Sequence, residues 1–462
     1  MAINQIIHLR KGLDIRLKGK AEEVKLQLKS NGRYALVPDD FEGVTPKVVV
    51  REGDHVKAGD ALFVNKQFPQ VRFSSPVSGK VVAVERGDRR KVLSIRVEAD
   101  AQQEFVDFGK KDLSKLDGQA VIDTLLKAGL FGYINQLPYA VSANPETKPK
   151  AIFVSALRDK PLACRFDYEC KGQEKDFVTG LTALSKIAKT YLGLGIQPDL
   201  QAELQKLGAD QVVTMNIFDG PCPAGNVGVQ VNHVDPVNKG DVVWTIGDPT
   251  VVLFIGRLLN TGRVDLHRTV ALCGSEVLKP VHVDMLVGEE LSTLLSNSYN
   301  ADHHVRIING NVLTGRQTSK DGFLGVHSSE ITVIPEGDDA DEMLGWIMPR
   351  LKQFSVNRSY FSWLQSLWFC NKKKEYVADA RIKGGERHII MSGEYDRVLP
   401  MDIYGEYLIK AIITGDIDRQ EQLGIYEVSP EDFALAEFVD SSKLELQRIV
   451  REGLNILRKE NA

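Results

Sequence analysis

Cysteine is scarce in this chain and is not arranged for metal binding. The five cysteines lie at positions 164, 170, 222, 273 and 370, and no two of them form a Cys-x-x-Cys pair. Zinc sites and cysteine-ligated iron–sulfur clusters usually depend on such closely spaced pairs. We therefore expect no metal centre of either kind, and reduced thiols that are mostly buried.

Excess positive charge and long apolar runs are also missing. The net charge is −4 and the isoelectric point is near 6.2, which argues against a nucleic-acid binder. Residues 251–255 form one of the longest apolar runs, which suits a buried strand and is far short of the roughly 18 residues of a spanning helix. The first ten residues lack a signal-peptide core. These absences predict a soluble, cytoplasmic protein.

A glycine-rich phosphate loop is missing where an α/β protein would usually keep one. Residues 128–139 follow a predicted helix stop at Gly129, and they contain aromatics, amides, a proline and one further glycine. A phosphate cradle needs several backbone N–H groups and close backbone approach. The fragment Gly193-Leu194-Gly195 is expected to follow a helix, and Pro198 stands where a dinucleotide fingerprint has its third glycine. We predict nucleotide binding at neither place.

Residues 1–100 contain short strands and repeated Gly-Asp turns. The turns at Gly53-Asp54 and Gly59-Asp60, followed by Ser-Pro-Val-Ser-Gly at residues 75–79, resemble the biotinyl/lipoyl carrier fold, a small β-sandwich. A carrier would place its modified lysine where this chain has Phe68. Lys66 is two residues away, so we expect an ordinary surface lysine without carrier chemistry.

The next two regions are predicted as separate domains. Residues 101–262 alternate helices and strands, which indicates a parallel α/β domain. Residues 263–336 are rich in strands around one short helix and suggest a ubiquitin-like β-grasp domain. The adjacent His303 and His304 should point apart, so we expect no shared metal. We predict strands over residues 151–155, 212–217, 268–272, 281–286, 305–308 and 330–334, and helices over residues 117–129, 177–191, 198–208 and 289–295.

The remaining regions are a connecting segment, residues 337–399, and a helical domain, residues 400–462. The connecting segment includes the most aromatic stretch of the chain, residues 359–370. Helical spacing would place Tyr360, Trp363 and Trp368 on one face. A core face and a partner-docking face both fit, so these three residues are docking candidates. In the helical domain, Ser429-Pro430 is a helix start signal.

Short motifs spread along essentially the whole chain carry a family resemblance. They lie at residues 11–14, 53–59, 75–79, 86–90, 223–225, 234–237 and 423–435. In this order and spacing they resemble the NqrA family, the A subunits of the sodium-translocating NADH:quinone reductase. The resemblance implies a peripheral subunit on the cytoplasmic side of the bacterial inner membrane. Its partners would be the other subunits of the complex, especially the membrane-embedded B subunit, with quinone as a further possible contact and no nucleic acid.

The same chain is distantly similar to the flavin subunit of respiratory complex I and to the C subunit of the Rnf complex. In those relatives, glycines after the helix stop cradle the flavin phosphate and clustered cysteines near the C-terminus hold an iron–sulfur cluster. Here residues 128–139 carry bulky side chains, the last cysteine is Cys370, and the flavin–threonine ester motif is absent. The resemblance implies a multidomain α/β and β fold: a biotinyl/lipoyl-like β-sandwich, a degenerate Rossmann-like domain, a β-grasp domain and a helical domain. It implies that flavin, iron–sulfur, NADH, quinone and Na⁺ belong to the complex, while this chain binds no cofactor and has no catalytic residue.

Four residues of the loop at residues 128–139 are candidates for quinone contact: Phe131, Tyr133, Pro138 and Tyr139. Their apolar and aromatic side chains suit a flat ring, and they suit ordinary core packing equally well. This chain departs from the family pattern at residues 135–139, at residues 158–162 and at Cys222, which leaves any role of those positions open.

Two other functions stay open at this point. A stand-alone flavin- or nucleotide-dependent oxidoreductase would show a stoichiometric flavin absorbance. A carrier-type binding module would show a biotin or lipoyl mass shift on Lys66. The missing phosphate loop and the misplaced lysine favour a component of a respiratory sodium pump.

Overall fold

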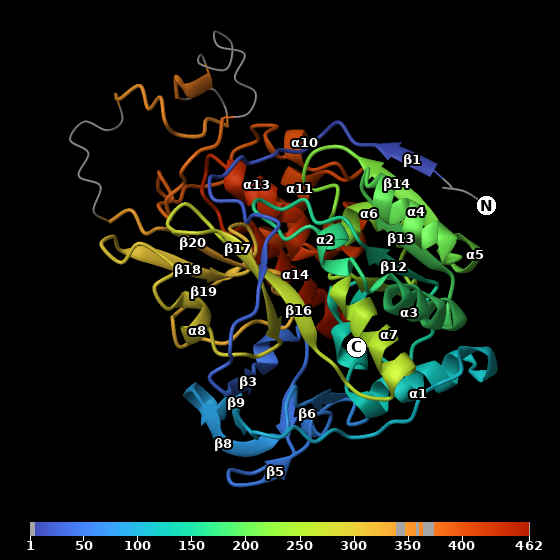
Figure 1. Ribbon diagram of the computed structural model, residues 1–462. Helices are drawn as coiled ribbons and strands as arrows, with labels where there is room; N and C mark the ends of the chain where they lie inside the picture. The colour runs from blue at the N-terminus through green and yellow to red at the C-terminus, as the bar shows by residue number, and fades with distance from the viewer. Residues whose placement is uncertain (1–4, 339–346, 357–359, 364–373, 462) are drawn as a thin grey trace.

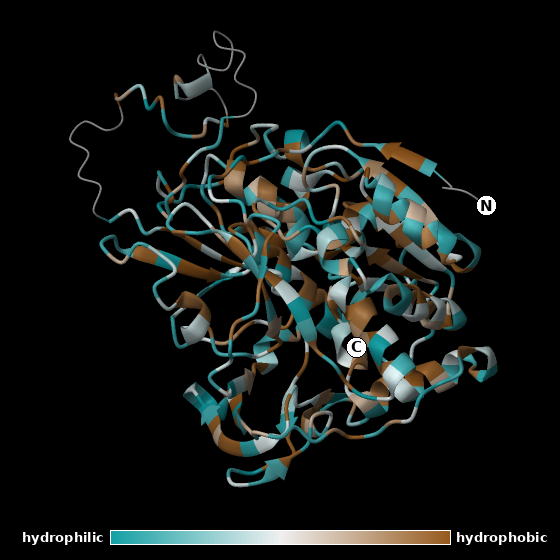
Figure 2. Ribbon diagram, viewed as in Figure 1, coloured by the Kyte–Doolittle hydropathy of each residue, from teal (hydrophilic) through white to brown (hydrophobic). Residues whose placement is uncertain are grey.

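The computed structural model describes residues 5–338, 347–356, 360–363 and 374–461 (Figure 1). Its strands form sheets of seven, six, four and three strands. Hydrophobic residues concentrate along the strands and the helix faces that pack on them, as Figure 2 shows. Among the described residues, no helix is long and apolar enough to cross a membrane.

The seven-stranded sheet is the centre of the α/β domain. Its strand order is β1 (Gln5–His8), β14 (Thr214–Asp219), β13 (Thr190–Leu194), β12 (Ala151–Ser155), β15 (Val243–Ile246), β10 (Asn135–Leu137) and β11 (Val141–Ser142). The strands from β1 to β15 pair in parallel, while β10 and β11 are antiparallel. Every residue of β12, β13 and β15 is buried, as expected of parallel strands covered on both faces.

Local sequence signals set the helices of this domain. Asp117 accepts a hydrogen bond from the Ala120 N–H and begins α1 (Gly118–Ala128), and Gly129, at φ 75°, ends it as predicted. A side chain at Gly129 would also overlap Ser74. The other helices are α2 (Phe166–Cys170), α3 (Glu174–Ile187), α4 (Pro198–Lys206), α5 (Ala209–Val212), α6 (Val227–Val234) and α7 (Thr250–Thr261).

Three predictions in this region were wrong. Residues 251–255 lie in helix α7, whose first ten residues are all buried, because a short apolar run does not distinguish a buried strand from a buried helix. The predicted helix over 177–191 ends at Ile187, and Tyr191 lies in strand β13, because helical spacing continued by chance across the loop. Consequently Gly193-Leu194 ends a strand and does not follow a helix.

The N-terminal β domain consists of the four-stranded and three-stranded sheets. The first has the order β3 (Arg33–Leu36), β9 (Val92–Ala99), β8 (Gly79–Arg86) and β5 (His55–Val56), and the second has the order β4 (Pro46–Val48), β6 (Ala61–Asn65) and β7 (Arg72–Ser74). Exposed Lys66 follows β6 in the β6–β7 connection. The N-terminal segment itself joins other sheets, since β1 pairs with β14 and β2 (Lys25–Leu26) pairs with β17 (Val281–Leu286).

The six-stranded sheet covers the region predicted as a β-grasp domain. Its order is β19 (Arg316–Thr318), β18 (Val305–Asn309), β20 (Glu330–Pro335), β16 (His267–Cys273), β17 and β2. The predicted strands are present, whereas the predicted helix over 289–295 is shorter, at Ser292–Leu295 (α8). His303 and His304 contact different carboxylates, Glu276 and Asp338.

The C-terminal region is helical, as predicted. Its helices are α10 (Tyr395–Val398), α11 (Gly405–Thr414), α12 (Ile417–Gln422), α13 (Ala434–Val439) and α14 (Leu446–Glu460). Ser429 begins a 3₁₀ turn (Pro430–Phe433), where its side chain and that of Asp432 form a reciprocal capping box. Cys164, Cys170, Cys222 and Cys273 are buried free thiols, as expected, and Cys370 lies outside the described residues.

Candidate functional site

A cavity of about 390 Å³ lies at the carboxyl end of the parallel sheet. The chain runs from β12 to β13 and β14 on one side, and then returns to place β15 on the other side of β12. Ligands of open α/β sheets bind at such a switch point. Leu157 and Arg158, just after β12, and Gly247 and Asp248, just after β15, all line the cavity.

Other segments complete the lining of the cavity. The loop after α1 contributes Tyr133 and Asn135, the six-stranded domain contributes His327 and Glu330, and the helical region contributes Arg451 among others. Most lining groups are polar or charged, while Tyr133, Leu137, Leu157, Val227 and Pro430 supply apolar wall. The site therefore suits a small molecule that has polar groups as well as an apolar part.

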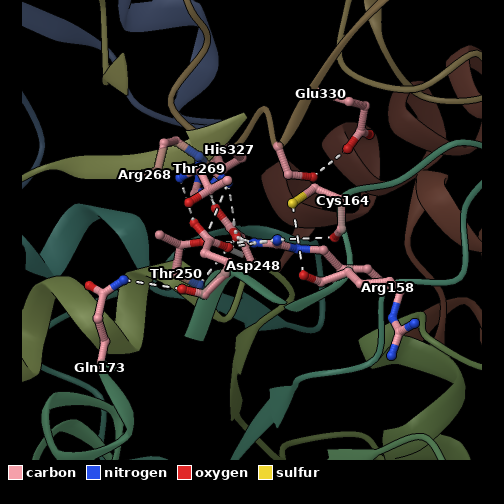
Figure 3. Close-up of polar contacts among 12 residues, drawn as sticks. Arg158, Cys164, Gln173, Asp248, Thr250, Arg268, Thr269, His327 and Glu330 are labelled. Carbon is pink, nitrogen blue, oxygen red and sulfur yellow. Dashed lines mark hydrogen bonds and ion pairs between the residues drawn. The ribbon is translucent and has the colours of Figure 1, made fainter. Parts of the chain in front are cut away.

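A buried ionic network reaches the wall of this cavity through Arg158 and Asp248 (Figure 3). Arg158 donates to Glu169 Oε2 at 2.7 Å and to Asp248 Oδ1 at 2.8 Å. Arg268 donates to Asp248 Oδ2 at 2.9 Å and to the Val326 carbonyl at 2.8 Å. These residues come from the loops after β12 and β15, from α2 and from β16, so the network joins the α/β domain to the six-stranded domain.

The two acids of the network, Asp248 and Glu169, each have several cationic or hydrogen-bonding neighbours. Burial would raise the pKa of Asp248, but the nearby side chains of Arg268, His327 and Arg158 outweigh burial and hold it well below its usual range. Glu169 also accepts from Thr250 Oγ1 at 3.0 Å and from the Thr269 N–H at 3.1 Å. Asp248 is thus a carboxylate at neutral pH, and the network is structural in character.

A second polar cluster connects the cavity to the helical region. Lys160 donates to Glu431 Oε1 at 2.5 Å and to Asn226 Oδ1 at 2.8 Å. Asn226 also donates to Asp432 Oδ1 at 3.1 Å. Burial, with a smaller contribution from neighbouring Glu431, raises the pKa of Asp432 to about 6 despite donors from Ser429 and Asn226.

Backbone N–H groups of the turn at residues 219–225 donate hydrogen bonds to acidic side chains of the same chain. The Cys222 N–H donates to Asp14 Oδ1 at 3.0 Å, and the Gly225 N–H donates to Asp159 Oδ2 at 2.7 Å. Burial raises the pKa of Asp159, although Lys160 and the Gly225 N–H oppose this effect. The departures from the family pattern at Cys222 and residues 158–162 therefore lie side by side.

The four quinone-contact candidates occupy different surroundings. Phe131 is fully buried, with its ring centroid 5.2 Å from that of Trp244. Tyr133 lines the cavity, and its hydroxyl has no hydrogen-bond partner among the described residues. Pro138 is buried, and Tyr139, at φ 83°, is half-buried with its carbonyl accepting from Arg451 at 2.8 Å. Of these four side chains, only Tyr133 belongs to the cavity wall.

The three docking candidates fall at the edge of the described chain. Tyr360 is half-buried beneath the guanidinium of Arg350, 5.5 Å from the ring centroid. Trp363 is also half-buried. Trp368 and most of the predicted aromatic helix lie outside the described residues, so the predicted common face stays a prediction.

Sequence reasoning missed Glu169, Asp248, Arg268 and His327 as members of the site. A weak signal existed for Arg268, because it is a lone cation in a strand whose next five residues are buried and uncharged. No spacing rule joins it to Arg158 or Asp248, since their proximity arises from the packing of two domains.

One solved structure shows a loose overall likeness. It is the crystal structure of NAD⁺-reducing [NiFe]-hydrogenase in the H₂-reduced state, with 12% identity and a TM-score of 0.35 over 78% of this chain and 67% of that chain. A likeness at this level carries no argument about function.

Comparison with known sequences is far more specific. Family models described as the NqrA N-terminal barrel-sandwich hybrid domain, the NqrA second alpha/beta domain and the NQRA C-terminal domain match residues 7–100, 116–264 and 269–320. The A subunits of the Na⁺-translocating NADH-quinone reductases of Photorhabdus laumondii and Haemophilus influenzae are 32% and 33% identical to it, over 98% of this chain and 100% of their own length. A Yersinia pestis relative of the same name is 33% identical over the same shares. The chain therefore belongs to the NqrA family, the A subunits of the Na⁺-translocating NADH-quinone reductase.

Proposed function

We propose that this chain is the peripheral A subunit of a Na⁺-translocating NADH:quinone reductase, on the cytoplasmic side of the bacterial inner membrane. The observation that carries the proposal is similarity over 98% of this chain and the full length of relatives with that name. In this role the chain belongs to an enzyme that couples NADH oxidation and quinone reduction to Na⁺ export.

Co-purification tests this assignment. A tagged chain expressed in its native cell and extracted with mild detergent should bring down membrane partners, including the B subunit, and NADH:quinone reductase activity. An untagged strain is the control. Recovery of the chain alone under conditions that preserve the activity of the membranes would contradict the proposal.

We further propose that the chain is structural and holds no flavin, NADH or iron–sulfur cluster of its own. In support, three bulky residues of the loop after α1 are packed against protein: Leu130, Phe131 and Ile134 are at most 1% exposed. Ser74 donates to the Ala128 carbonyl at 2.8 Å, and a side chain at Gly132 would overlap the ring of Phe73. The glycines of this loop thus serve contact with the β domain.

An absorbance spectrum checks this proposal directly. The purified chain should show no flavin band near a one-to-one ratio with protein. A stoichiometric flavin band that survives gel filtration would instead favour the stand-alone oxidoreductase.

We also propose a fold assignment for each of three domains. Along the chain, β12, β13, β14 and β15 follow one another as four parallel strands. In the sheet they lie in the order β14, β13, β12, β15, which supports a degenerate Rossmann-like domain. The paired sheets with Gly-Asp turns support a biotinyl/lipoyl-like β-sandwich, and the strands around α8 support a ubiquitin-like β-grasp.

We propose that quinone contacts the wall of the cavity at Tyr133. Tyr133→Leu keeps much of the volume but removes the flat ring, and it should raise the apparent KM for quinone about 5-fold in the complex, since an aromatic contact contributes on the order of 1 kcal/mol. The KM for NADH should not change. Phe131→Leu is the matched control, because Phe131 is buried beside Trp244 and does not line the cavity. Equal effects of both variants on quinone would refute this assignment.

A further inference from the structure

The β8–β9 hairpin ends in an exposed basic turn. Residues 86–91 contain four basic residues and a single acid, Asp88, in a chain whose net charge is −4. All four basic side chains, Arg86, Arg89, Arg90 and Lys91, are exposed. The turn is therefore a local concentration of positive charge on an otherwise slightly acidic protein.

The backbone of this turn is unusual. Arg89 and Arg90 have φ angles of 53° and 63°, in the left-handed region that residues with a Cβ atom rarely adopt. Glycine would be accommodated there more easily. Arg86 Nη1 donates to the Arg90 carbonyl at 3.2 Å and closes the turn. Two consecutive arginines thus stand at the hairpin tip in a conformation that suits glycine better.

The charges at the tip are only partly compensated. Lys91 pairs with Asp39 at 2.5 Å, and nearby Glu85 pairs with Arg96 at 2.7 Å. The guanidinium groups of Arg89 and Arg90, by contrast, have no ion pair or hydrogen bond within the part of the chain that the structure describes. These two cations are available to an external anion.

The apolar groups beside the tip are aliphatic and few. Val82 on β8 and Leu93 on β9 are 45% and 44% exposed. The hairpin has no aromatic residue, and Arg89 and Arg90 stand on an exposed turn. The aromatic and arginine anchors of protein interfaces usually lie in well-packed apolar surroundings. An anionic lipid surface attracts basic side chains through charge density without requiring a complementary shape. Figure 1 shows β8 at the lower end of the molecule, opposite to α10 and α11.

We propose that the tip of the β8–β9 hairpin binds the headgroups of anionic phospholipids at the membrane surface, with Leu93 adding an apolar contact at the headgroup boundary. The inference rests on the proposed function only in assuming that a membrane lies next to this chain. The contact would orient the peripheral subunit while other surfaces bind its protein partners.

Vesicle co-sedimentation of the full-length chain tests the proposal. The wild type should bind phosphatidylcholine vesicles that contain phosphatidylglycerol, should bind pure phosphatidylcholine vesicles far more weakly, and should lose affinity as salt is added. The double variant Arg89→Gln/Arg90→Gln should bind the anionic vesicles about 30-fold more weakly, because each basic residue near such a surface contributes about 1 kcal/mol.

A matched control removes the same charge elsewhere. Lys127 on α1 and Lys175 on α3 are exposed, and Lys127→Gln/Lys175→Gln should leave vesicle binding within about 2-fold of the wild type. The proposal is overturned if the wild type does not prefer anionic vesicles or if the arginine variant binds them as well as the wild type does.

A protein partner for this tip would give a different pattern. Loss of membrane subunits from the arginine variant in detergent, with vesicle binding unchanged, would also overturn the lipid proposal. Failure of the wild type to co-purify with any membrane subunit would instead count against the proposed function and leave the vesicle result to be judged separately.

Discussion

Two of the contacts that join the α/β domain to its neighbours, an aromatic joint and an ionic joint, are built in opposite ways. The aromatic joint, formed by Phe41, Phe73, Phe131 and Tyr133, packs the loop after α1 against the N-terminal β domain and the sheet. Phe41 lies 4.3 Å from Phe73 and 5.1 Å from Tyr133 between ring centroids. The ionic joint, formed by Arg158, Glu169, Asp248 and Arg268, fixes the six-stranded domain to the same sheet.

The difference between the joints concerns how each responds to change. The aromatic joint depends on filled volume, so a smaller side chain costs free energy in proportion to the cavity it leaves. The ionic joint depends on complete pairing, so the loss of one cation leaves a buried carboxylate without compensation. We therefore expect the ionic joint to tolerate single substitutions less well than the aromatic joint does.

The largest expected effect comes from breaking the ionic joint. Arg268→Met keeps an unbranched apolar stem but leaves Asp248 with fewer donors, and should lower the free energy of unfolding by about 4 kcal/mol. Urea denaturation followed by circular dichroism measures this loss. Arg419→Met, which removes the partner of Asp416 in a pair that is exposed on both sides, is the control and should cost less than about 1 kcal/mol. A loss at Arg268 as small as that at Arg419 would contradict the expectation.

A somewhat smaller effect is expected in the aromatic joint. Phe131→Ala should lower the free energy of unfolding by about 3 kcal/mol, because it removes a fully buried ring beside Trp244. Phe131→Leu keeps most of the volume and should cost less than about 1.5 kcal/mol. The same denaturation experiment compares the two variants. Similar losses for Leu and Ala would show that volume does not govern this joint.

The smallest effect concerns pH and the contact between the α/β domain and the helical region. With its pKa raised to about 6, Asp432 binds its proton more tightly in the folded than in the unfolded protein. Its contribution to stability is therefore complete below about pH 4 and is lost as the pH rises through about 6. The free energy of unfolding of the wild type, relative to Asp432→Asn, should fall by about 2 kcal/mol across this interval. Denaturation at several pH values measures the difference, and a flat or rising difference would be the opposite of this expectation.

The sequence was sufficient for the elements whose signals are local. The cap at Asp117 and the left-handed stop at Gly129 stand where residue chemistry predicts them, and Ser429 begins a helical turn, as its start signal predicts. The apolar stripe of α14 is equally local, because Leu446, Val450, Leu454 and Leu457 repeat at helical spacing and are all buried.

Local signals failed where tertiary burial decides the conformation. The apolar run at residues 251–255 became a helix, since α7 is buried over most of its surface and no polar face reveals its period. The candidate site was only partly predictable for the same reason. Tyr133 was named from its loop, whereas His327 reaches the cavity from a different domain.

The sequence by itself determined the family, most of the elements and the absence of a glycine-rich phosphate loop, because each of these depends on residue types at short spacing. Only the tertiary structure decided that Phe131 packs against Trp244, that Arg158 and Arg268 share Asp248, and that β1 and β2 join sheets far along the chain. Those contacts join residues far apart in sequence, and the burial that makes them strong exists only after the domains have packed together.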